Sequence, residues 1–581
     1  MNGQTNNLIT FSRQIYSGIK ELKHLSLSSL RKVFSLMGKK EKIIFFSLLV
    51  IGLISLFISL KNFYVNHTQP APTFGGSYTE GMKGQPLYIN PLLAFQEPDL
   101  SLVKLIYSGL YKIGSQGQLL PDLAEGLPQI SQDQKQYTIN LKRNAKWHNG
   151  KDLTAEDVVF TIETLKNPDF KSPLRPLWLA TSVEKLSDYQ LRFTTKDVSG
   201  PFIYNLTLPI LPKNVWGKID AQKFLLSSFN LSPIGSGPFA VKEVSSQKNS
   251  KVQKITFQSF SNFHLGKPKL DNISIRFYDN DESLMEGLLA KEIQGFGYIA
   301  SGNEEFAVPK EIQKLTAPLP QYQMVFFNLN SKILAEQNFR QALTQSIDQK
   351  QLLAEVLKNE AILPSLPLLL ENGQNFRPSL PGYNPQNAKQ ILEKNGWILD
   401  ANTNLRTKKG ATAELTLATN DSPVNARTAQ FLADAWKEIG IKINLEILPT
   451  RQLTEDLIKP RKFDILIFPQ KLGADPDPFV LWHSSQIKNP GLNLTGFENQ
   501  QTDKLINDGR NTTNQKLRDE KYLQFYSLLN EKLPAIFLSQ AQFVYLVSNE
   551  IKNISLKTIY EPSMRFYDAP NWYTETKRVW K

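Results

Sequence analysis

Cysteine is absent from this 581-residue sequence. Without a thiol the chain has no disulfide, no thiolate nucleophile and no cysteine-ligated zinc or iron–sulfur cluster. The same absence removes the residue that carries the lipid of an acylated lipoprotein. Thiol chemistry and anchoring through a cysteine-linked lipid are therefore both excluded.

Histidine is scarce, and the common catalytic motifs are missing. The sequence contains no H-E-x-x-H, no G-x-S-x-G elbow and no Walker A loop. The run GFGYIA at 295–300 imitates a dinucleotide fingerprint but lacks a suitably placed acidic partner downstream. We therefore predict no enzymatic activity, no metal and no cofactor. The five histidines, none at metal-ligand spacing, are His24, His67, His148, His264 and His483.

Acidic residues are fewer than basic ones, 54 against 67, which gives a net charge of +13. Residues 1–42 hold eight basic residues and two acidic ones, so this short segment carries a surplus of six. The remaining surplus is spread over more than 500 residues without a dense basic run. Such a distribution is typical of a solvated surface and not of a groove that follows phosphates. We expect no nucleic-acid partner.

One long apolar run stands out at residues 43–60, eighteen residues without a charge. At ~1.5 Å per residue it nearly matches a hydrocarbon core of ~30 Å. A cleaved signal peptide would have a shorter apolar core and a small-residue cleavage site, and here Lys61 to Tyr64 follow instead. The pattern favours an uncleaved transmembrane helix. The basic residues before it place 1–42 in the cytoplasm and the bulk of this single-pass cell-membrane protein outside.

Two short segments flank this predicted helix. Within 1–42, apolar residues stand among basic ones at Ile15, Ile19, Leu22 and Leu25. This spacing suits an amphipathic helix on the inner leaflet, and a disordered basic tail is an equal alternative. Residues 61–73 include the polar, proline-rich stretch NHTQPAPT and are predicted as a linker.

Beyond residue 74, strand-like and helix-like segments alternate. Thr154 is a good N-cap for a helix with acidic residues in its first turn. Residues 424–439 predict an amphipathic helix that ends at Gly440. The nearly all-apolar run 462–468 is typical of a strand buried on both faces of a mixed sheet. We expect an α/β fold with more than one sheet. Further strands are predicted at 137–141, 254–257, 273–277 and 441–448.

Several sequence blocks, in order across the outer region, resemble the extracytoplasmic oligopeptide-, dipeptide- and nickel-binding proteins of ABC transporters, known as family 5. One block alone would be weak, but so many in the same order and spacing are specific. The blocks lie at 75–81, 88–92, 105–111, 121–125, 137–141, 145–150, 154–160, 233–239, 327–330, 339–343 with 347–348, 474–479 and 481–486.

The resemblance implies a periplasmic-binding-protein-like fold with two lobes, an extra inserted domain and one preceding transmembrane helix. On this basis the sequence is divided into a cytoplasmic basic tail (1–42), transmembrane helix (43–60), linker (61–73), first part of lobe I (74–111), inserted small domain (112–205), second part of lobe I (206–318), lobe II (319–545) and a return to lobe I (546–581).

The resemblance also implies the function. Family members capture a ligand, here a peptide and most simply an oligopeptide, between closing lobes and deliver it to a permease. This chain has neither a pore nor an ATP site, so ABC permease subunits and their ATPases are expected partners. A ligand-sensing receptor that signals through the cytoplasmic tail is an alternative, as is binding of a non-peptide ligand or a metal complex. Weak peptidase or chaperone-like activity is the remaining alternative.

Peptide binders of this family hold an extended ligand through main-chain hydrogen bonds. The corresponding segments here are 94–96 and 468–470, although Pro469 removes one donor. The acid that holds the peptide's α-amino group should fall at Leu472, so either Asp475 replaces it or no acid holds the ligand. The candidate substrate-binding residues are Phe95, Gln96, Tyr107, Phe468, Gln470, Asp475, Asp477, Trp482 and His483.

The loop that carries Asp475 and Asp477 supports two interpretations. Asp-Pro-Asp-Pro cannot continue a helix or a central strand, and it follows a predicted buried strand. Open α/β sheets bind ligands at such strand ends, which places these acids at a cleft. In the alternative interpretation the acids cap the next helix and Trp482 belongs to the core.

Three other motifs are expected to be structural. The run at 147–150 (Trp-His-Asn-Gly) predicts a turn, with Trp147 packed beneath it. The run Gly235-Ser236-Gly237-Pro238 predicts a close backbone crossing near the hinge. Arg340, at the start of a predicted helix, is expected to pair with a buried acid.

Overall fold

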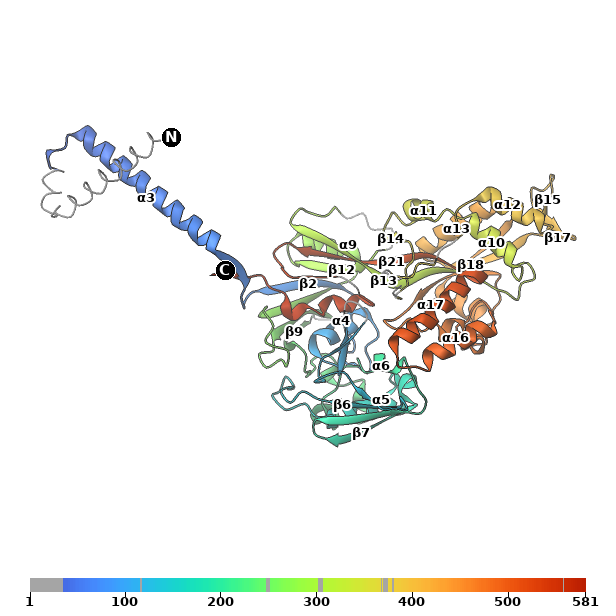
Figure 1. Ribbon diagram of the computed structural model, residues 1–581, viewed down its shortest axis with the longest axis horizontal. Helices are drawn as coiled ribbons and strands as arrows, with labels where there is room; N and C mark the ends of the chain where they lie inside the picture. Colours follow the sequence, from blue (N-terminus) through green and yellow to red (C-terminus); the bar gives the residue numbers. More distant parts are fainter. Residues whose placement is uncertain are drawn as a thin grey trace, which may run out of the picture. The chain divides into compact units, whose positions relative to one another are not determined.

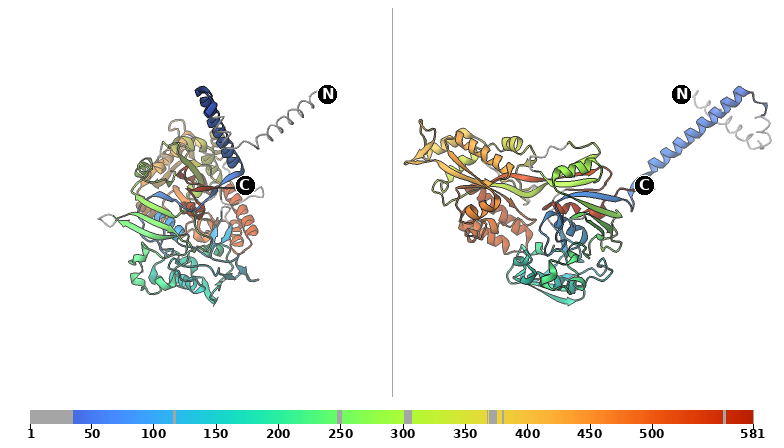
Figure 2. Two further views of the ribbon diagram at one scale, coloured as in Figure 1. Left: turned by 90° about the vertical axis from the view of Figure 1, so that its left-hand side faces the viewer. Right: turned by 180° about the vertical axis from the view of Figure 1, so that it is seen from behind.

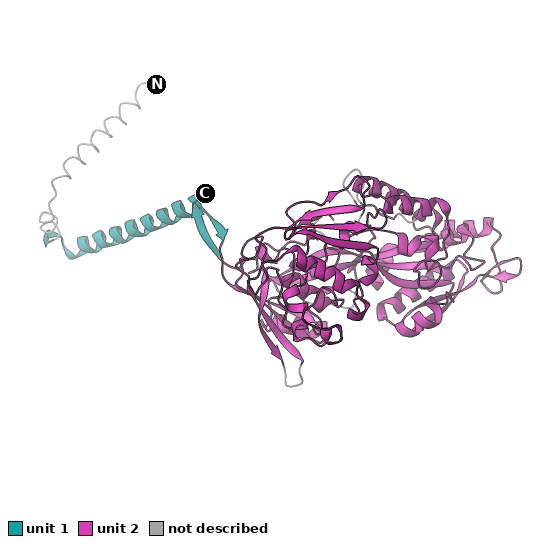
Figure 3. Cartoon of the chain, turned by 90° about the horizontal axis from the view of Figure 1, so that it is seen from below, with its two compact units in different colours: residues 1–72, 576–581 teal, residues 73–575 magenta. Residues whose placement is uncertain are grey.

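The structure is a computed structural model that describes residues 35–114, 118–246, 251–300, 307–366, 368, 375–378, 381–556 and 559–580. The chain divides into two compact units, residues 1–72 with 576–581 and residues 73–575 (Figure 3). Most of the basic tail lies outside the described residues. The structure therefore does not test whether this tail is an amphipathic helix or a disordered segment.

The first unit contains α3 (Lys39–His67), which includes the predicted transmembrane run. None of its side chains is buried, and by length and composition it is able to cross a membrane. The helix continues seven residues past Leu60 because residues 61–67 contain no glycine or proline. It ends where Thr68 adopts an extended conformation, two residues before Pro70.

Part of the predicted linker is a strand. Residues Thr68–Pro72 form β1, which pairs antiparallel with β22 (Thr576–Trp580) from Thr68↔Trp580 to Pro72↔Thr576. The extended conformation that Pro70 and Pro72 favour suits this edge pairing as well as a loose linker. The structure thus replaces the linker of 61–73 with the end of a helix and a strand, and it assigns residues 576–580 to the first unit.

The second unit is built on a mixed sheet. Among the described residues it has eleven strands in the order β19-β18-β20-β13-β21-β12-β2-β11-β10-β9, with β14 added beside β21. The strands are β2 (Ser77–Lys83), β9 (Phe239–Ser246), β10 (Val252–Ser259), β11 (Asn272–Tyr278), β12 (Gly295–Ile299), β13 (Ile312–Phe327), β14 (Ala361–Ile362), β18 (Glu414–Asn420), β19 (Lys442–Leu448), β20 (Ile465–Lys471) and β21 (Ala535–Ser548).

Helices cover both faces of the β18–β20–β13 part of this sheet (Figures 1 and 2). On one face α10 (Gln337–Gln345), α12 (Pro385–Lys394) and α13 (Pro423–Glu438) form a core with the buried side chains of Ile465 and Ile467. On the other face α16 (Gln500–Arg510) and α17 (Gln515–Lys532) pack against Leu466 and its neighbours. The predicted helix at 424–439 and the strand buried on both faces are both confirmed.

A four-stranded antiparallel sheet, β5-β6-β8-β7, lies within the segment 112–205. The helix predicted after Thr154 is α5 (Ala155–Lys166), and Thr154 forms a capping box with Asp157. Trp147 is fully buried, and the amide of Gly150 donates to its carbonyl at 2.8 Å, which confirms the predicted turn. The strands are β5 (Gln129–Ile130), β6 (Gln136–Asn140), β7 (Thr181–Ser187) and β8 (Gln190–Thr195).

The remaining elements are short, apart from α4 (Glu97–Ile106) and α9 (Asp281–Leu289). They are β3 (Tyr111–Ile113), β4 (Leu119–Pro121), β15 (Ile398–Leu399), β16 (Arg406–Lys408), β17 (Ala411–Thr412), α6 (Phe202–Asn205), α7 (Lys213–Trp216), α8 (Ala221–Phe224), α11 (Gln349–Gln351), α14 (Thr450–Gln452) and α15 (Phe479–Trp482).

Two local predictions have different outcomes. A Cβ on Gly235 would lie 1.9 Å from the carbonyl oxygen of Ile106, so the close backbone crossing is confirmed. Among the described residues Arg340 pairs with no acid, and it donates instead to backbone carbonyls, among them those of Leu533 and Leu334 at 2.8 and 2.7 Å. The ion pair expected for Arg340 is therefore wrong, because carbonyls satisfy a buried guanidinium as well.

The predicted lobe boundaries at 318/319 and 545/546 fall inside the two long strands β13 and β21. The ladder between these strands is irregular from Pro318 to Tyr322. Buried residues on one side of this irregularity join the core of α4 and β2, and those on the other side join the core of α17. This separation supports the division into lobes, which remains a prediction.

Candidate ligand-binding site

The acidic loop follows β20, as the sequence predicts. Asp477 accepts a hydrogen bond at 3.0 Å from the amide of Phe479, the first residue of the short helix α15, whose N-cap residue is Pro478. It also accepts from the hydroxyl of Tyr522 at 3.3 Å and pairs with the Nε of Arg510 at 3.1 Å. Asp477 thus binds the first amide of this helix without being its N-cap residue, and it also belongs to a charged network.

Asp475 forms an ion pair with Arg518, which lies on α17. Its Oδ1 is 2.5 Å from Nη2 of Arg518 and also accepts from the amide of Asp477 at 3.2 Å. The Arg518 side chain is only 1% exposed. Its Nε and Nη1 have no hydrogen-bond partner among the described residues, although both are buried. Since buried guanidinium donors are normally satisfied, this pair is incomplete.

The environment of Asp475 disfavours its charged form. Burial raises the pKa of its carboxyl to about 6, and the nearby charge of Asp477 acts in the same direction. The Arg518 guanidinium opposes this effect. At neutral pH the carboxylate is therefore present at a free-energy cost that an additional cation would reduce.

Residues of the predicted small domain face this network. The Tyr204 ring centre lies 5.8 Å from the Arg518 guanidinium carbon. The amide of Gly200 donates to the carbonyl of Arg510 at 2.7 Å, and a Cβ on Gly200 would come within 2.9 Å of the Arg518 Nε. Between the two sides lies a cavity of about 260 Å³, lined by Ser199, Phe202 and Asn205 and by residues of α16. The acidic loop therefore lies where predicted lobe II meets the predicted small domain.

The second half of β20 is paired on one side only. Tyr322 of β13 lies opposite Gln470, and Met324 lies opposite Phe468. On the other side, β18 pairs with β20 only through Ile465 and Leu466 within the described residues. Residues 468–471 therefore present a strand edge outside the ladder with β18, as recognition of an extended peptide requires.

A second cavity, of about 310 Å³, lies beside this strand. Its lining is more apolar than polar, and on its wall the Nε2 of Gln323 donates to the Oδ1 of Asn425 at 2.7 Å. Ala300, from predicted lobe I, lines it together with Pro469 from lobe II. Space for side chains is thus present next to the open edge.

Phe95 and Gln96 lie at the start of α4, where Gln96 is the N-cap residue. Both side chains are exposed, and Phe95 retains 62% of its accessible surface. Neither of the two amides donates to a backbone carbonyl among the described residues. This segment therefore has free main-chain donors, like the edge of β20.

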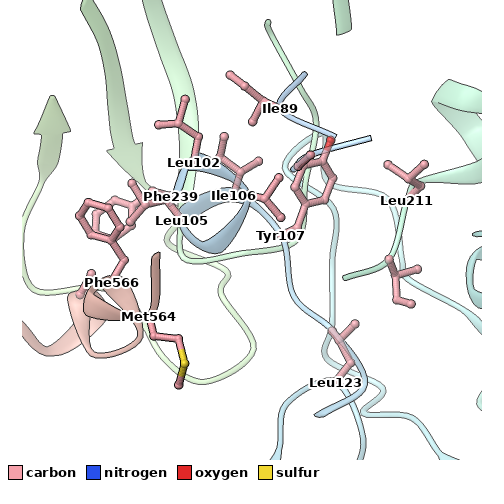
Figure 4. Packing of buried hydrophobic residues seen from close by; sticks show 14 of the residues in the cluster. Ile89, Leu102, Leu105, Ile106, Tyr107, Leu123, Leu211, Phe239, Met564 and Phe566 are labelled. Atoms are coloured by element: carbon pink, nitrogen blue, oxygen red, sulfur yellow. The ribbon is translucent and has the colours of Figure 1, made fainter. Parts of the chain in front are cut away.

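Three other candidates lie elsewhere. Tyr107 is buried in the core of lobe I beside Ile106 and Leu102, and its hydroxyl has no hydrogen-bond partner among the described residues (Figure 4). Trp482 is 1% exposed and packs against Phe326, as the core interpretation predicts. Trp482 reaches no open surface, and the cavity of about 320 Å³ that Tyr107 lines shares no lining residue with the acidic loop, so the structure does not bring these two residues to that loop.

His483 follows the acidic loop, and its ring packs against that of Phe479 with the ring centres 4.7 Å apart. Its Nδ1 lies 2.9 Å from the hydroxyl of Ser485, and its Nε2 lies 3.2 Å from the amide nitrogen of Asn507. Both ring nitrogens therefore have local partners. Within the described residues no three or more His, Asp or Glu side chains are grouped as metal ligands.

Sequence reasoning missed the basic and aromatic partners of the acids. Arg518, Tyr522 and Tyr526 follow one another at intervals of four, so α17 presents them on one face. The Tyr526 hydroxyl donates to the carbonyl of Pro476 at 3.3 Å. This helical spacing was visible in the sequence, but nothing local indicated that the face would meet the acidic loop.

Comparisons with known proteins agree with this architecture. Residues 118–490, more than half of the chain, match the model of the middle region of bacterial extracellular solute-binding proteins, family 5. The oligopeptide-binding protein AppA of Bacillus subtilis is 26% identical over 550 residues, which cover 92% of this chain and 99% of that protein. Its structure in complex with a nonapeptide is similar with a TM-score of 0.64, covering 87% of this chain and 99% of the other.

A further solved structure, NikZ from Campylobacter jejuni in complex with Ni(L-His), has a TM-score of 0.67 at 24% identity and covers 86% of this chain and 99% of the other. It shows likeness of fold alone. The chain belongs to the bacterial extracellular solute-binding proteins, family 5. The predicted family and the α/β fold class are thereby confirmed, and membership shows a binding protein and not an enzyme.

Proposed function

We propose that this protein is the extracytoplasmic substrate-binding component of an ABC importer and captures peptides between its two lobes. The similar proteins include an oligopeptide-binding protein of Bacillus subtilis and a dipeptide-binding protein of Escherichia coli. Peptides share a main chain and differ in side chains, so the site must recognise the main chain and tolerate variety elsewhere.

The observation that carries the proposal is the half-paired strand 468–471 next to the acidic loop. A peptide laid along this edge adds a strand to the sheet. Pro469 supplies no amide hydrogen, so part of the donor set comes from the opposite segment at Phe95 and Gln96. The mainly apolar cavity beside Pro469 accepts side chains of the ligand.

Asp475 is proposed to hold the α-amino group of the peptide. Its Oδ1 is occupied by Arg518 and the amide of Asp477, whereas Oδ2 accepts no hydrogen bond among the described residues. An ammonium group at Oδ2 would offset the cost of the buried carboxylate. The site would then pair one acid with a protein cation and a ligand cation.

The test compares peptides with free and with acetylated α-amino groups. We expect Asp475→Ala to weaken binding of the free peptide by about 2 kcal/mol or more, roughly 30-fold, and to leave the acetylated peptide nearly unchanged. Calorimetric titration measures both affinities, with the surface variant Asp188→Ala as a matched control. Equal losses for both peptides would assign Asp475 a purely structural role.

The ligand itself is the first unknown to measure. We expect native mass spectrometry of the purified full-length chain in detergent to show a ladder of bound masses that match short peptides. The length range follows directly from the ladder. A single non-peptide mass, or a metal complex, would keep the family and overturn the proposed substrate.

The proposal also includes the membrane and a permease. Helix α3 tethers the chain with residues 1–42 inside, and closed, loaded protein docks on permease subunits driven by their ATPases. The chain itself has no Walker A loop, so the energy comes from those partners. Alkaline carbonate extraction tests the span, since a peripheral protein would be released and a spanning one retained.

A further inference from the structure

Three aromatic side chains gather where α3 ends. The Trp580 ring centre lies 6.4 Å from that of Phe63 and 6.2 Å from that of Tyr64, with near-perpendicular planes in the second pair. All three remain exposed: Phe63 by 55%, Tyr64 by 45% and Trp580 by 65%. We refer to Phe63, Tyr64 and Trp580 as the aromatic collar.

The collar is held in place by main-chain pairing and by Arg578. Strands β1 and β22 pair along their whole length, which brings Trp580 opposite Thr68. The Nη2 of Arg578 donates to the carbonyls of Val65 and Thr68 at 2.8 and 2.7 Å, and its Nε donates to the Thr68 hydroxyl at 2.7 Å. A cation that satisfies carbonyls at the last turn stabilises a helix C-terminus.

The position of the collar along α3 suits a particular partner. Phe63 and Tyr64 follow Leu60, the last residue of the apolar run, by three and four positions, or about 5–6 Å along the helix. Tryptophan and tyrosine concentrate at this level of membrane proteins because one part of each ring system is apolar and the other forms hydrogen bonds. Lys61 and Lys577, both exposed, add positive charge beside them.

We propose that the aromatic collar binds the headgroup region of the outer lipid leaflet, with Trp580 as an interfacial anchor supplied by a strand that lies 510 positions from the helix end in sequence. This inference rests on the proposed membrane span of α3. The continuity of the collar with the apolar run 43–60 of α3 favours lipid over a protein partner at this surface. The membrane contact is thus made by two distant segments of the chain.

Tryptophan fluorescence tests this directly. The other seven tryptophans, all described by the structure, are at most 2% exposed, so Trp580 is the one that reports on a lipid contact. In the full chain reconstituted into phosphatidylcholine vesicles, we expect lipids brominated near the headgroup to quench emission more than lipids brominated near the chain end. The variant Trp580→Phe should lose this quenching and keep the remaining emission.

A second variant separates anchoring from mere proximity. Arg578→Met should release β22 from the helix end, which would lower the lipid quenching and raise quenching by aqueous acrylamide. Carbonate extraction of the same vesicles keeps the two proposals distinct. A retained protein without lipid quenching of Trp580 would overturn the collar alone, whereas a released protein would overturn the membrane span on which it rests.

Discussion

Two buried acid–arginine pairs in the second unit differ in how completely they are satisfied. Arg565 donates to Glu80 at 2.6 Å, and its Nη1 also reaches Glu97 and a backbone carbonyl at 2.8 Å. The second oxygen of Glu80 accepts from the hydroxyl of Tyr545 at 2.7 Å. No side-chain nitrogen or oxygen of this pair is left buried and unpartnered in the described structure.

The Asp475–Arg518 pair has the same chemistry, but fewer of its hydrogen-bonding groups are satisfied. Two nitrogens of Arg518 have no hydrogen-bond partner in the part of the chain that the structure describes, and burial holds the pKa of Asp475 above its usual range. A closed network holds a fold together, whereas an open one retains capacity for a ligand or for movement between lobes. The comparison therefore separates a structural ion pair from a candidate functional one although both are buried.

The largest expected effect is the loss of the closed pair. Glu80→Ala leaves the Arg565 guanidinium buried with fewer partners, and we expect the free energy of unfolding to fall by about 3–5 kcal/mol. Urea unfolding followed by circular dichroism measures this. Peptide affinity of the folded fraction should be unchanged. A loss of affinity without a loss of stability would mean that Glu80 belongs to the site.

The open pair should show itself in the pH dependence of stability. The pKa of Asp475 is about 6 in the folded chain, against an ordinary value of 3.8. Between these values the folded state binds more protons, so the free energy of unfolding should fall as the pH rises from about 4 to about 6 and stay level above. The shift corresponds to about 2–3 kcal/mol.

Asp475→Asn removes the titrating group and serves as the control for this slope. Unfolding of both proteins is measured across the same pH range, and the stability of the natural chain relative to the variant should decrease from pH 4 to pH 6. A difference that stays constant over this range, or rises with pH, would show that Arg518 keeps the carboxylate charged and that the pair is closed after all.

A smaller effect is expected where the small domain meets Arg518. Tyr204→Leu keeps an apolar side chain and removes the ring that lies over the guanidinium. We expect a loss of about 0.5–1 kcal/mol, a factor of two to five, in peptide affinity. Stopped-flow release of a fluorescent peptide should assign the change to a faster dissociation rate. An unchanged release rate would remove Tyr204 from the closing contact.

The smallest effect sets the baseline. Lys185 and Asp188 form an ion pair with exposures of 40% and 68%. Because water screens such a pair, Asp188→Ala should leave the free energy of unfolding unchanged within the error of the measurement. A larger change, measured in the same urea titrations, would mean that exposed ion pairs also stabilise this fold, so that a loss of stability would no longer be specific to the buried pairs.

Local sequence signals predicted local structure well. The helix predicted at 424–439 is observed as α13, and Gly440 ends it with a positive φ of 85°. The strand predicted at 273–277 is observed as β11. These elements depend on periodicity and on the conformational freedom of single residues, both of which are present in a short window.

Long-range partners were not predictable in the same way. The pairing of β1 with β22 and of Asp475 with Arg518 joins segments whose own sequences contain no mark of each other. Arg340 illustrates the same point, since a buried arginine donates either to an acid or to carbonyls and only the fold decides which. The sequence of the acidic loop was thus enough to locate the candidate site. The residues that contact the acids could be identified only from the tertiary structure.

The pairing of β1 and β22 has a consequence for biosynthesis. β1 leaves the ribosome about 500 residues before its partner, and at a synthesis rate of about 5–20 residues per second the interval lasts about 25–100 s. During that time the strand has an open edge that invites wrong pairing. Pro70 and Pro72 remove two of its amide donors. Pairing of β1 with any other strand is therefore weak until β22 has been synthesised.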